Sequence, residues 1–316
     1  MVEKKSLKGS MGSLMIVFIV LGLGVVLSIA TPTFLTSANI MNILRQISVN
    51  GLLAIGMSMV ALTGGIDLSV GSIVAYAGIL TAGMLNYTSL PIGVIVIIAV
   101  CIGVIMGVIN GYFVAYWNAP PFVVTLAMMT VGRGLTYIFC DGKPISKLPD
   151  AFLKIGKGSV IGLPIPFIIL MVVFVVFTIM LTKMKHGRYI YAVGGNQQAS
   201  MVSGINVKRV ILSVYLFSGL CCGIAAVVLT ARVSAGLPKA GDGYELDAIA
   251  ATVIGGTSLA GGTGRLWGTM LGVLLLGMVN TGLDLLNVTS YYQQVVKGLI
   301  ILGAILIDSR RNKIAN

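Results

Sequence analysis

Long apolar stretches follow one another along almost the whole chain, and they constrain its fold more than any other feature. A helix needs about 20 mostly apolar residues to cross the hydrocarbon core of a bilayer. Stretches of that length recur here with short connections between them. Only 9% of the 316 residues are charged and 57% are hydrophobic, whereas about a quarter of a soluble domain is charged. The sequence therefore predicts an all-α, polytopic transmembrane helical bundle in a single domain, residues 1–316.

Ten apolar runs are predicted to cross the membrane, and an even number returns both termini to the same side. The runs are residues 14–31, 42–63, 66–86, 91–117, 121–140, 164–182, 210–231, 245–261, 266–286 and 291–308. Two of them are weaker because charged residues burden their ends and glycines interrupt them. Arg45 lies in the run 42–63, and Glu245 and Asp247 lie in the run 245–261. For each of these two, a full crossing and a re-entrant segment both remain open.

The basic residues indicate which side of the membrane each end occupies. The formal net charge is +12, but the cations do not form a stripe interleaved with aromatic residues, so we expect no nucleic-acid partner. The positive-inside rule instead predicts that three basic groups lie in the cytoplasm, which places both termini and the loop 183–209 there. One connection departs from the rule, because residues 141–163 should lie outside and yet carry four lysines. The three groups are Lys4, Lys5 and Lys8; Lys183, Lys185, Arg188, Lys208 and Arg209; and Arg310, Arg311 and Lys313, and the four exceptions are Lys143, Lys147, Lys154 and Lys157.

Nothing in the sequence points to catalysis, a metal or a bound cofactor. The four cysteines form no CxxC pair, and the single histidine, His186, lies far from any of them, so we expect no metal site. The Gly-rich stretch 255–265 lacks the Lys-Ser/Thr ending of a nucleotide-binding P-loop, and no strand precedes it. We therefore expect a chain that is not an enzyme and does not hydrolyse ATP by itself.

Two glycine-paired segments resemble each other. TGGIDLSVGS at 63–72 and AGGTGRLWGT at 260–269 both carry a glycine pair, followed six residues later by Gly71 or Gly268 with a hydroxyl residue after it. A parallel internal repeat, common in transporters, would produce this pattern. Chance similarity between two Gly-rich turns would produce it equally well, and both readings remain open.

Polar residues inside the predicted spans are candidates for a translocation pathway, because each is costly in hydrocarbon without a partner or water. Hydrogen bonds between helices are the ordinary alternative for the uncharged ones. Arg133, near the middle of a predicted span, should face a cavity or an acid. The candidates are Asn50, Thr63, Asp67, Asn110, Thr125, Arg133 and Asn280.

The loop 183–209 contains a predicted short helix. Residues 197–203 follow Asn196, a good N-cap, and precede Gly204, a good helix terminator. A short polar helix between glycines, held at a membrane surface, fits docking into a groove of another protein. A plain surface loop is the alternative from these residues alone.

At this loop the chain resembles the permeases of bacterial ABC importers for monosaccharides, the ribose, galactose and xylose class. The resemblance covers most of the chain, with the ribose members nearest. It is carried by GMSMVALTGGIDLSVGS (56–72), GRYIYAVGGNQQASMVSGINV (187–207), YELDAIAATVIGGTSLAGG (244–262) and SYYQQVVKGLIILGAILID (290–308).

The resemblance implies a channel-forming subunit in the bacterial inner membrane. It implies a homodimer of permeases, two ATPase subunits that bind ATP and Mg, and a periplasmic or lipid-anchored sugar-binding protein. It also implies a coupling helix that seats in the ATPase. Relatives often have an acidic residue early in that helix, where this chain has glutamines. The residues implied in coupling are Gly194, Gly195, Asn196, Gln197, Gln198, Ala199, Ser200, Met201, Ser203 and Gly204.

An ion-coupled secondary sugar carrier is the alternative function. Such carriers need membrane carboxylates or broken helices to bind the coupling ion. Apart from Glu245 and Asp247 at the start of the run 245–261, only Asp67 and Asp284 lie near predicted spans, both close to an end.

Overall fold

The protein is an all-α polytopic membrane protein. The computed structural model describes the backbone of residues 2–315 and the side chains of residues 16–303 and 306. Within this part of the chain, seven helices are long and apolar enough to cross a membrane. They are α2 (Ser37–Leu62), α3 (Val70–Tyr87), α4 (Ile92–Tyr116), α5 (Pro121–Cys140), α7 (Ile165–Lys183), α10 (Val207–Val233) and α12 (Leu266–Leu285). Each coincides with a predicted crossing, and α2 is one continuous helix.

The other three predicted crossings fall on α1 (Val2–Ala30), α11 (Tyr244–Ile254) and α13 (Ser290–Ala315). The run predicted at 245–261 differs most from the structure. Its helix stops at Ile254 because residues 255–265 turn through glycines with positive φ, including Gly256 at 86° and Gly261 at 91°. At 1.5 Å per residue, the 11 residues of α11 reach about half way across a hydrocarbon core of about 30 Å. The number of crossings, ten, stays a prediction.

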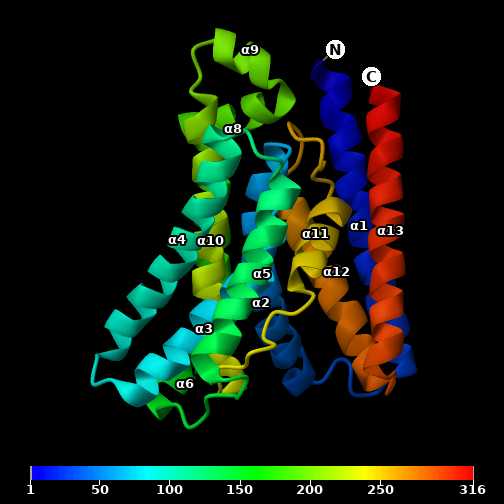
Figure 1. The fold of residues 1–316 in the computed structure, drawn as a ribbon. Coiled ribbons are helices and arrows are strands. Elements are labelled where there is room, and N and C mark those ends of the chain that lie inside the picture. The colour runs from blue at the N-terminus through cyan, green and yellow to red at the C-terminus, as the bar shows by residue number, and fades with distance from the viewer. Residues whose placement is uncertain (1, 316) are drawn as a thin grey trace.

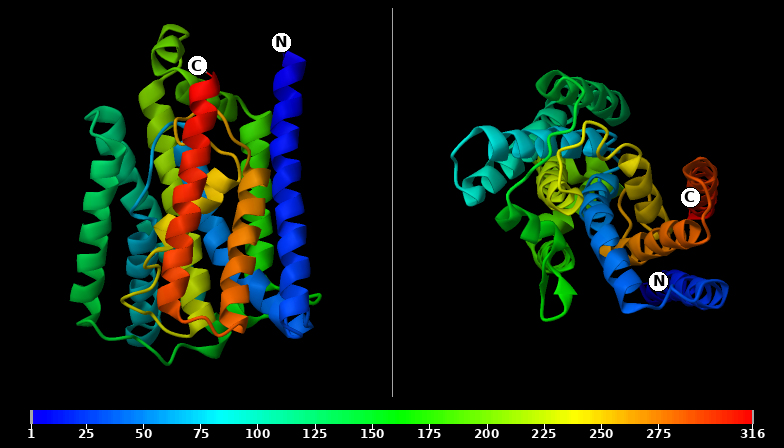
Figure 2. Two further views of the ribbon diagram at one scale, coloured as in Figure 1. Left: turned by 90° about the vertical axis from the view of Figure 1, so that its right-hand side faces the viewer. Right: turned by 90° about the horizontal axis from the view of Figure 1, so that it is seen from below.

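The two ends of the bundle differ. The start of α1, the end of α13 and the short helices α8 (Lys185–Gly195) and α9 (Gln197–Val202) all lie at one end (Figures 1 and 2). The cations of the loop 183–209 lie at this end too, whereas the terminal cations Lys4, Lys5, Lys8, Arg310, Arg311 and Lys313 lie outside the described side chains.

The connection 141–163 lies at the opposite end (Figure 1) and is more ordered than a plain loop. It forms α6 (Asp150–Lys157) and a small antiparallel hairpin of β1 (Ser159–Val160) and β2 (Leu163–Pro164). Phe152 of α6 is fully buried, and a Cβ at Gly156 would overlap the backbone of Arg232 at the end of α10. The four lysines of this connection are all exposed, although the connection itself packs against the bundle.

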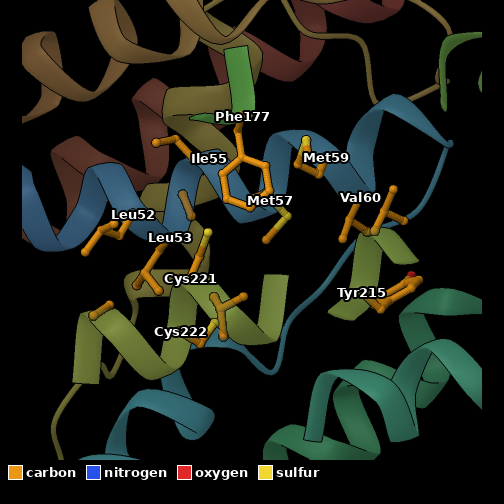
Figure 3. Close-up of a cluster of buried hydrophobic side chains, with 14 of the residues drawn as sticks. Leu52, Leu53, Ile55, Met57, Met59, Val60, Phe177, Tyr215, Cys221 and Cys222 are labelled. Atoms are coloured by element: carbon orange, nitrogen blue, oxygen red, sulfur yellow. The ribbon is translucent and has the colours of Figure 1, made fainter. Parts of the chain in front are cut away.

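The core is built around α2, which neighbouring helices surround almost completely. Leu52, Leu53, Ile55 and Met57 of α2 have no exposed surface, and Phe177 of α7 packs among the same cluster (Figure 3). Helices α4 and α10 form the tightest pair in the bundle. A Cβ at Gly103 of α4 would overlap the carbonyl oxygen of Gly219 on α10, so small residues let these two backbones approach closely.

Candidate functional site

Helix α9 has the caps that the sequence predicts. The Asn196 side chain accepts a hydrogen bond of 2.9 Å from the Ala199 amide, and Ser203 is the C-cap. Gly204 follows with φ of +81°, a conformation that favours glycine at the end of a helix. The predicted helix is therefore confirmed, one residue shorter than expected.

Most of the residues assigned to coupling stand clear of the bundle. Figure 1 shows α9 at the tip of the molecule, beyond α8. Ser200 is buried and Gly194 is half-buried, whereas the other eight predicted coupling residues are exposed. Val202, which the predicted set omits, is 90% exposed. Together with the exposed Met201 it gives α9 an apolar tip.

Helix α8 ends against two glycine turns that lie far apart in the sequence. We name residues 62–65 the first glycine turn and residues 260–264 the second glycine turn. The Gly262 amide donates a 2.9 Å hydrogen bond to the carbonyl oxygen of Leu62, so the turns of the two similar segments are neighbours. The Tyr191 hydroxyl of α8 donates a 3.0 Å bond to the carbonyl oxygen of Gly264. Burial raises the pKa of this phenol, despite the nearby Arg265, which keeps it a donor at neutral pH.

A buried polar cluster follows the first glycine turn, where the chain runs without helical structure from Gly65 to α3. Asp67 has no exposed surface. Its carboxylate accepts hydrogen bonds from the Ser69 amide at 3.0 Å, the Ser69 hydroxyl at 2.6 Å and the Ser218 hydroxyl at 2.8 Å. Asn110 of α4 donates to the Ser69 hydroxyl at 2.8 Å. The cluster thus ties the non-helical segment to both α4 and α10.

Two buried polar atoms near this cluster have no hydrogen-bond partner among the described residues, Asn110 Oδ1 and Tyr215 Oη. The Tyr215 hydroxyl lies 2.8 Å from where a Cβ on Gly65 would stand, so the glycine leaves room for the phenol. Within the described part of the chain, no three His, Cys, Asp or Glu side chains are grouped to hold a metal ion. The groups available here are one carboxylate, that of Asp67, and the uncharged hydroxyl and amide groups that surround it.

The other pathway candidates are distributed among several places. Thr125 of α5 donates to the Ile66 carbonyl at 3.2 Å, beside the cluster, and Thr63 donates to Val60 at 2.8 Å. Arg133 instead donates two 2.9 Å bonds to the carbonyls of Pro238 and Ala240, in the segment before α11. Its hydrogen-bond partners are backbone carbonyls. We expected a cavity or an acid beside it, and among the described residues it forms no ion pair.

The two remaining pathway candidates lie apart from these groups. Asn50 is half-buried on α2, and Asn280 is buried on α12 with its Oδ1 lacking a hydrogen-bond partner in the described chain. The structure therefore brings Asp67, Asn110 and Thr125 together around the segment 64–69, and it leaves Arg133 with a different segment.

Sequence reasoning missed several partners of the predicted residues. Ser69 and Ser218 hold Asp67, and the Lys297 ammonium lies 3.1 Å from the Asp247 carboxylate, joining α13 to α11. One local signal was available, because Asp-x-Ser at 67–69 is typical of a turn in which the aspartate accepts from the amide two residues on. No comparable signal marks Ser218, which is one hydroxyl among several in an apolar helix.

Comparison with known proteins agrees with this architecture. Residues 39–305 match the family described as branched-chain amino acid transport system / permease component. The ribose import permease protein of Bacillus subtilis is 48% identical over 91% of this chain and 90% of its own length. The D-allose transport system permease protein of Escherichia coli is 40% identical over 89% and 86%. The L-arabinose ABC transporter permease protein of Azospirillum brasilense is 39% identical over 94% and 88%.

No solved structure matches the chain. The family match covers most of the sequence, and the relatives named above align along nearly their full lengths. These findings confirm the resemblance to monosaccharide importer permeases drawn from the sequence, and the chain belongs to this family of transport-system permease components.

Proposed function

We propose that this chain is the channel-forming subunit of an ATP-binding-cassette importer that moves a monosaccharide, with ribose as the first candidate, across a bacterial inner membrane. Separate ATPase subunits bind ATP and Mg and supply the energy. A sugar-binding protein delivers the substrate, and a second copy of the chain completes the channel. The names of the relatives support the sugar class, since ribose, allose and arabinose permeases are all about 40% identical to this chain or more.

One observation carries the proposal: α9 is a self-capped helix that projects from one end of the bundle with an apolar tip. A membrane protein gains nothing for its own fold by exposing Val202 to this degree, since burying such a side chain contributes about 1.5 kcal/mol or more. Docking of α9 in a groove of a partner would bury the Val202 side chain. In our proposal this partner is the ATPase, and its closure around ATP displaces α9.

The pathway residues have a particular place in the mechanism. Asp67, Asn110 and Thr125 have no exposed surface in this conformation, so they contact sugar only if the bundle opens around the segment 64–69. Arg133 and Asn50 are partly exposed and are the candidates that need the least rearrangement. Receptor-bound sugar then passes by weak hydrogen bonds to amide and hydroxyl groups while the receptor provides selectivity.

The proposal is tested by purification and transport together. The tagged chain in mild detergent should bring down the ATPase subunit of the same transporter, and reconstituted vesicles should take up ribose only with ATP and receptor present. Uptake that continues without the ATPase but stops with an uncoupler would establish the ion-coupled carrier instead. A complex that forms but transports allose or arabinose and not ribose would correct the sugar alone.

A further inference from the structure

Three backbone segments meet at Gly194, the penultimate residue of α8. A Cβ at this position would overlap the carbonyl oxygen of Leu62 in the first glycine turn and would lie 2.5 Å from the Gly262 amide nitrogen in the second. Those two atoms are already joined by the 2.9 Å hydrogen bond between the turns. Helix α8 therefore contacts both turns at one residue, Gly194.

The contact is made from backbone on every side. A Cβ at Gly261 would come within 2.7 Å of the Gly194 carbonyl oxygen and 3.0 Å of the Gly64 nitrogen, and a Cβ at Gly262 within 2.9 Å of Gly195 Cα. Close-packed interiors transmit displacement because they have little free volume, and backbone atoms cannot yield by changing rotamer. A movement of α8 must consequently move both turns.

Helix α8 is itself held as a rigid unit. Its Ile190 and Val193 side chains are at most 1% exposed, and Tyr191 bonds to the second glycine turn at Gly264. Only Asn196 separates α8 from α9. A displacement of α9 therefore has a short, stiff route to Gly194.

Each turn joins two helices of the bundle, α2 and α3 for the first and α11 and α12 for the second. The first glycine turn continues through Asp67 into α3, and the second follows the end of α11. The starts of these two helices also touch, because a Cβ at Gly71 of α3 would overlap the Gly241 carbonyl oxygen and lie 2.5 Å from Glu245 Oε2 of α11. The chain around the two turns is thus in contact at the turns themselves and again at the starts of α3 and α11.

From this geometry we infer that Gly194 is a positioning residue through which displacement of α9 reaches both glycine turns at once. The inference rests on the proposed function, because it takes α9 as the helix moved by the ATPase. It adds the point at which α8 contacts the two turns and the reason for glycine there, because any side chain at residue 194 would separate α8 from the turns. It also explains the glycine pair of the second turn, because a Cβ at Gly261 or Gly262 would meet Gly194 or Gly195.

The test is Gly194→Ala in the complete importer, reconstituted in nanodiscs with its ATPase and ribose-charged receptor. We expect the complex to assemble, while receptor-stimulated ATPase activity and ribose uptake fall at least tenfold. Gly134→Ala on α5 is the matched control, since nothing lies within 4 Å of a Cβ there, and it should leave stimulation within twofold of the wild type. Gly195→Ala, also in open space, measures any loss that comes from the docking surface alone.

The outcomes separate the inference from the proposal beneath it. If receptor-stimulated ATPase activity in Gly194→Ala equals that in Gly195→Ala, the positioning role of Gly194 is refuted while the importer proposal stands. A wild-type chain that binds no ATPase would overturn the proposed function instead. If Gly194→Ala does not fold, Tyr191→Phe decides, because it removes only the hydrogen bond to Gly264. A two- to fivefold loss of receptor-stimulated ATPase activity with normal assembly supports transmission through α8 and the two turns, and unchanged activity refutes it.

Discussion

Helix α9 and the segment 64–69 are both short stretches that connect other helices, yet their surroundings are opposite. All of α9 except Ser200 is exposed, and its caps come from Asn196 and Ser203 next to it in the chain. Asp67 has no exposed surface and takes a hydrogen bond from Ser218, 151 positions away. The first stretch is complete by itself, and the second is completed by other helices.

This difference separates two kinds of importance. A residue of the segment 64–69 holds α3 to α4 and α10, so its loss should be felt in the stability of the fold. A residue of α9 contacts little of its own chain, so its loss should be felt only by a partner. Substitutions in the two regions should therefore affect different measurements.

The largest effect is expected for Asp67→Leu. It removes the acceptor of three hydrogen bonds and leaves buried donors without a partner, which should cost about 2–4 kcal/mol of unfolding free energy. Thermal unfolding in detergent should show a midpoint lower by about 5 °C or more. Asp284→Leu, at an exposed aspartate, is the control and should shift it little. An unchanged midpoint for Asp67→Leu would remove the contrast between the two regions.

The next effect is expected for Val202→Asp on α9. Placing a charge at an apolar contact should weaken ATPase binding about ten- to a hundredfold, or about 1.4–2.8 kcal/mol. The unfolding midpoint should not change, because the side chain is 90% exposed. Surface-immobilised binding measurements give the affinity, with Val160→Asp on the hairpin at the opposite end as the control. If both variants bind the ATPase like the wild type, α9 is not the docking helix.

A smaller loss of stability is expected for Ser218→Ala on α10. It removes one of the three hydrogen bonds to Asp67 without adding bulk, at a cost of about 1–2 kcal/mol. Combined with Asp67→Leu it should add almost nothing further, because the two residues share one interaction. Thermal unfolding of both single variants and the double variant measures this coupling, and full additivity would show that the hydrogen bond is unimportant.

The smallest effect is expected for Asn196→Ala. Loss of the cap on the Ala199 amide should destabilise α9 by about 1 kcal/mol. Faster amide hydrogen exchange should be confined to residues 197–203, and Asn196→Asp should restore slow exchange because aspartate caps as well. Faster exchange that extends into α3 or α10 would mean that α9 is not as independent as its contacts indicate.

Local chemistry explains what the sequence predicts well. The caps of α9 depend on residues 196 and 204, which lie within one turn of the helix. They can therefore be recognised from the sequence without knowledge of the tertiary structure. The apolar runs of α4, α7 and α10 are equally self-contained, because their length alone decides whether they fit a bilayer.

Long-range contacts explain what the sequence predicts poorly. The partners of Arg133 are carbonyls 105 and 107 positions away, and carbonyls carry no sequence signature. The similarity of the two glycine-paired segments was visible, but nothing in it requires that Leu62 and Gly262 bond to each other. The end of α11 at Ile254 was missed because an apolar run continued past Gly255 and Gly256, where glycine conformation rather than hydropathy decides.

The shared end of α1, α13 and α9 has a practical consequence for experiments on this protein. Because α1 begins and α13 ends at the same end of the bundle as α9 (Figure 1), a fluorescent fusion or purification handle at either terminus would stand at the end where a partner of α9 must approach. A reporter inserted in the exposed hairpin turn at Ile161 and Gly162, at the far end, would leave that approach free.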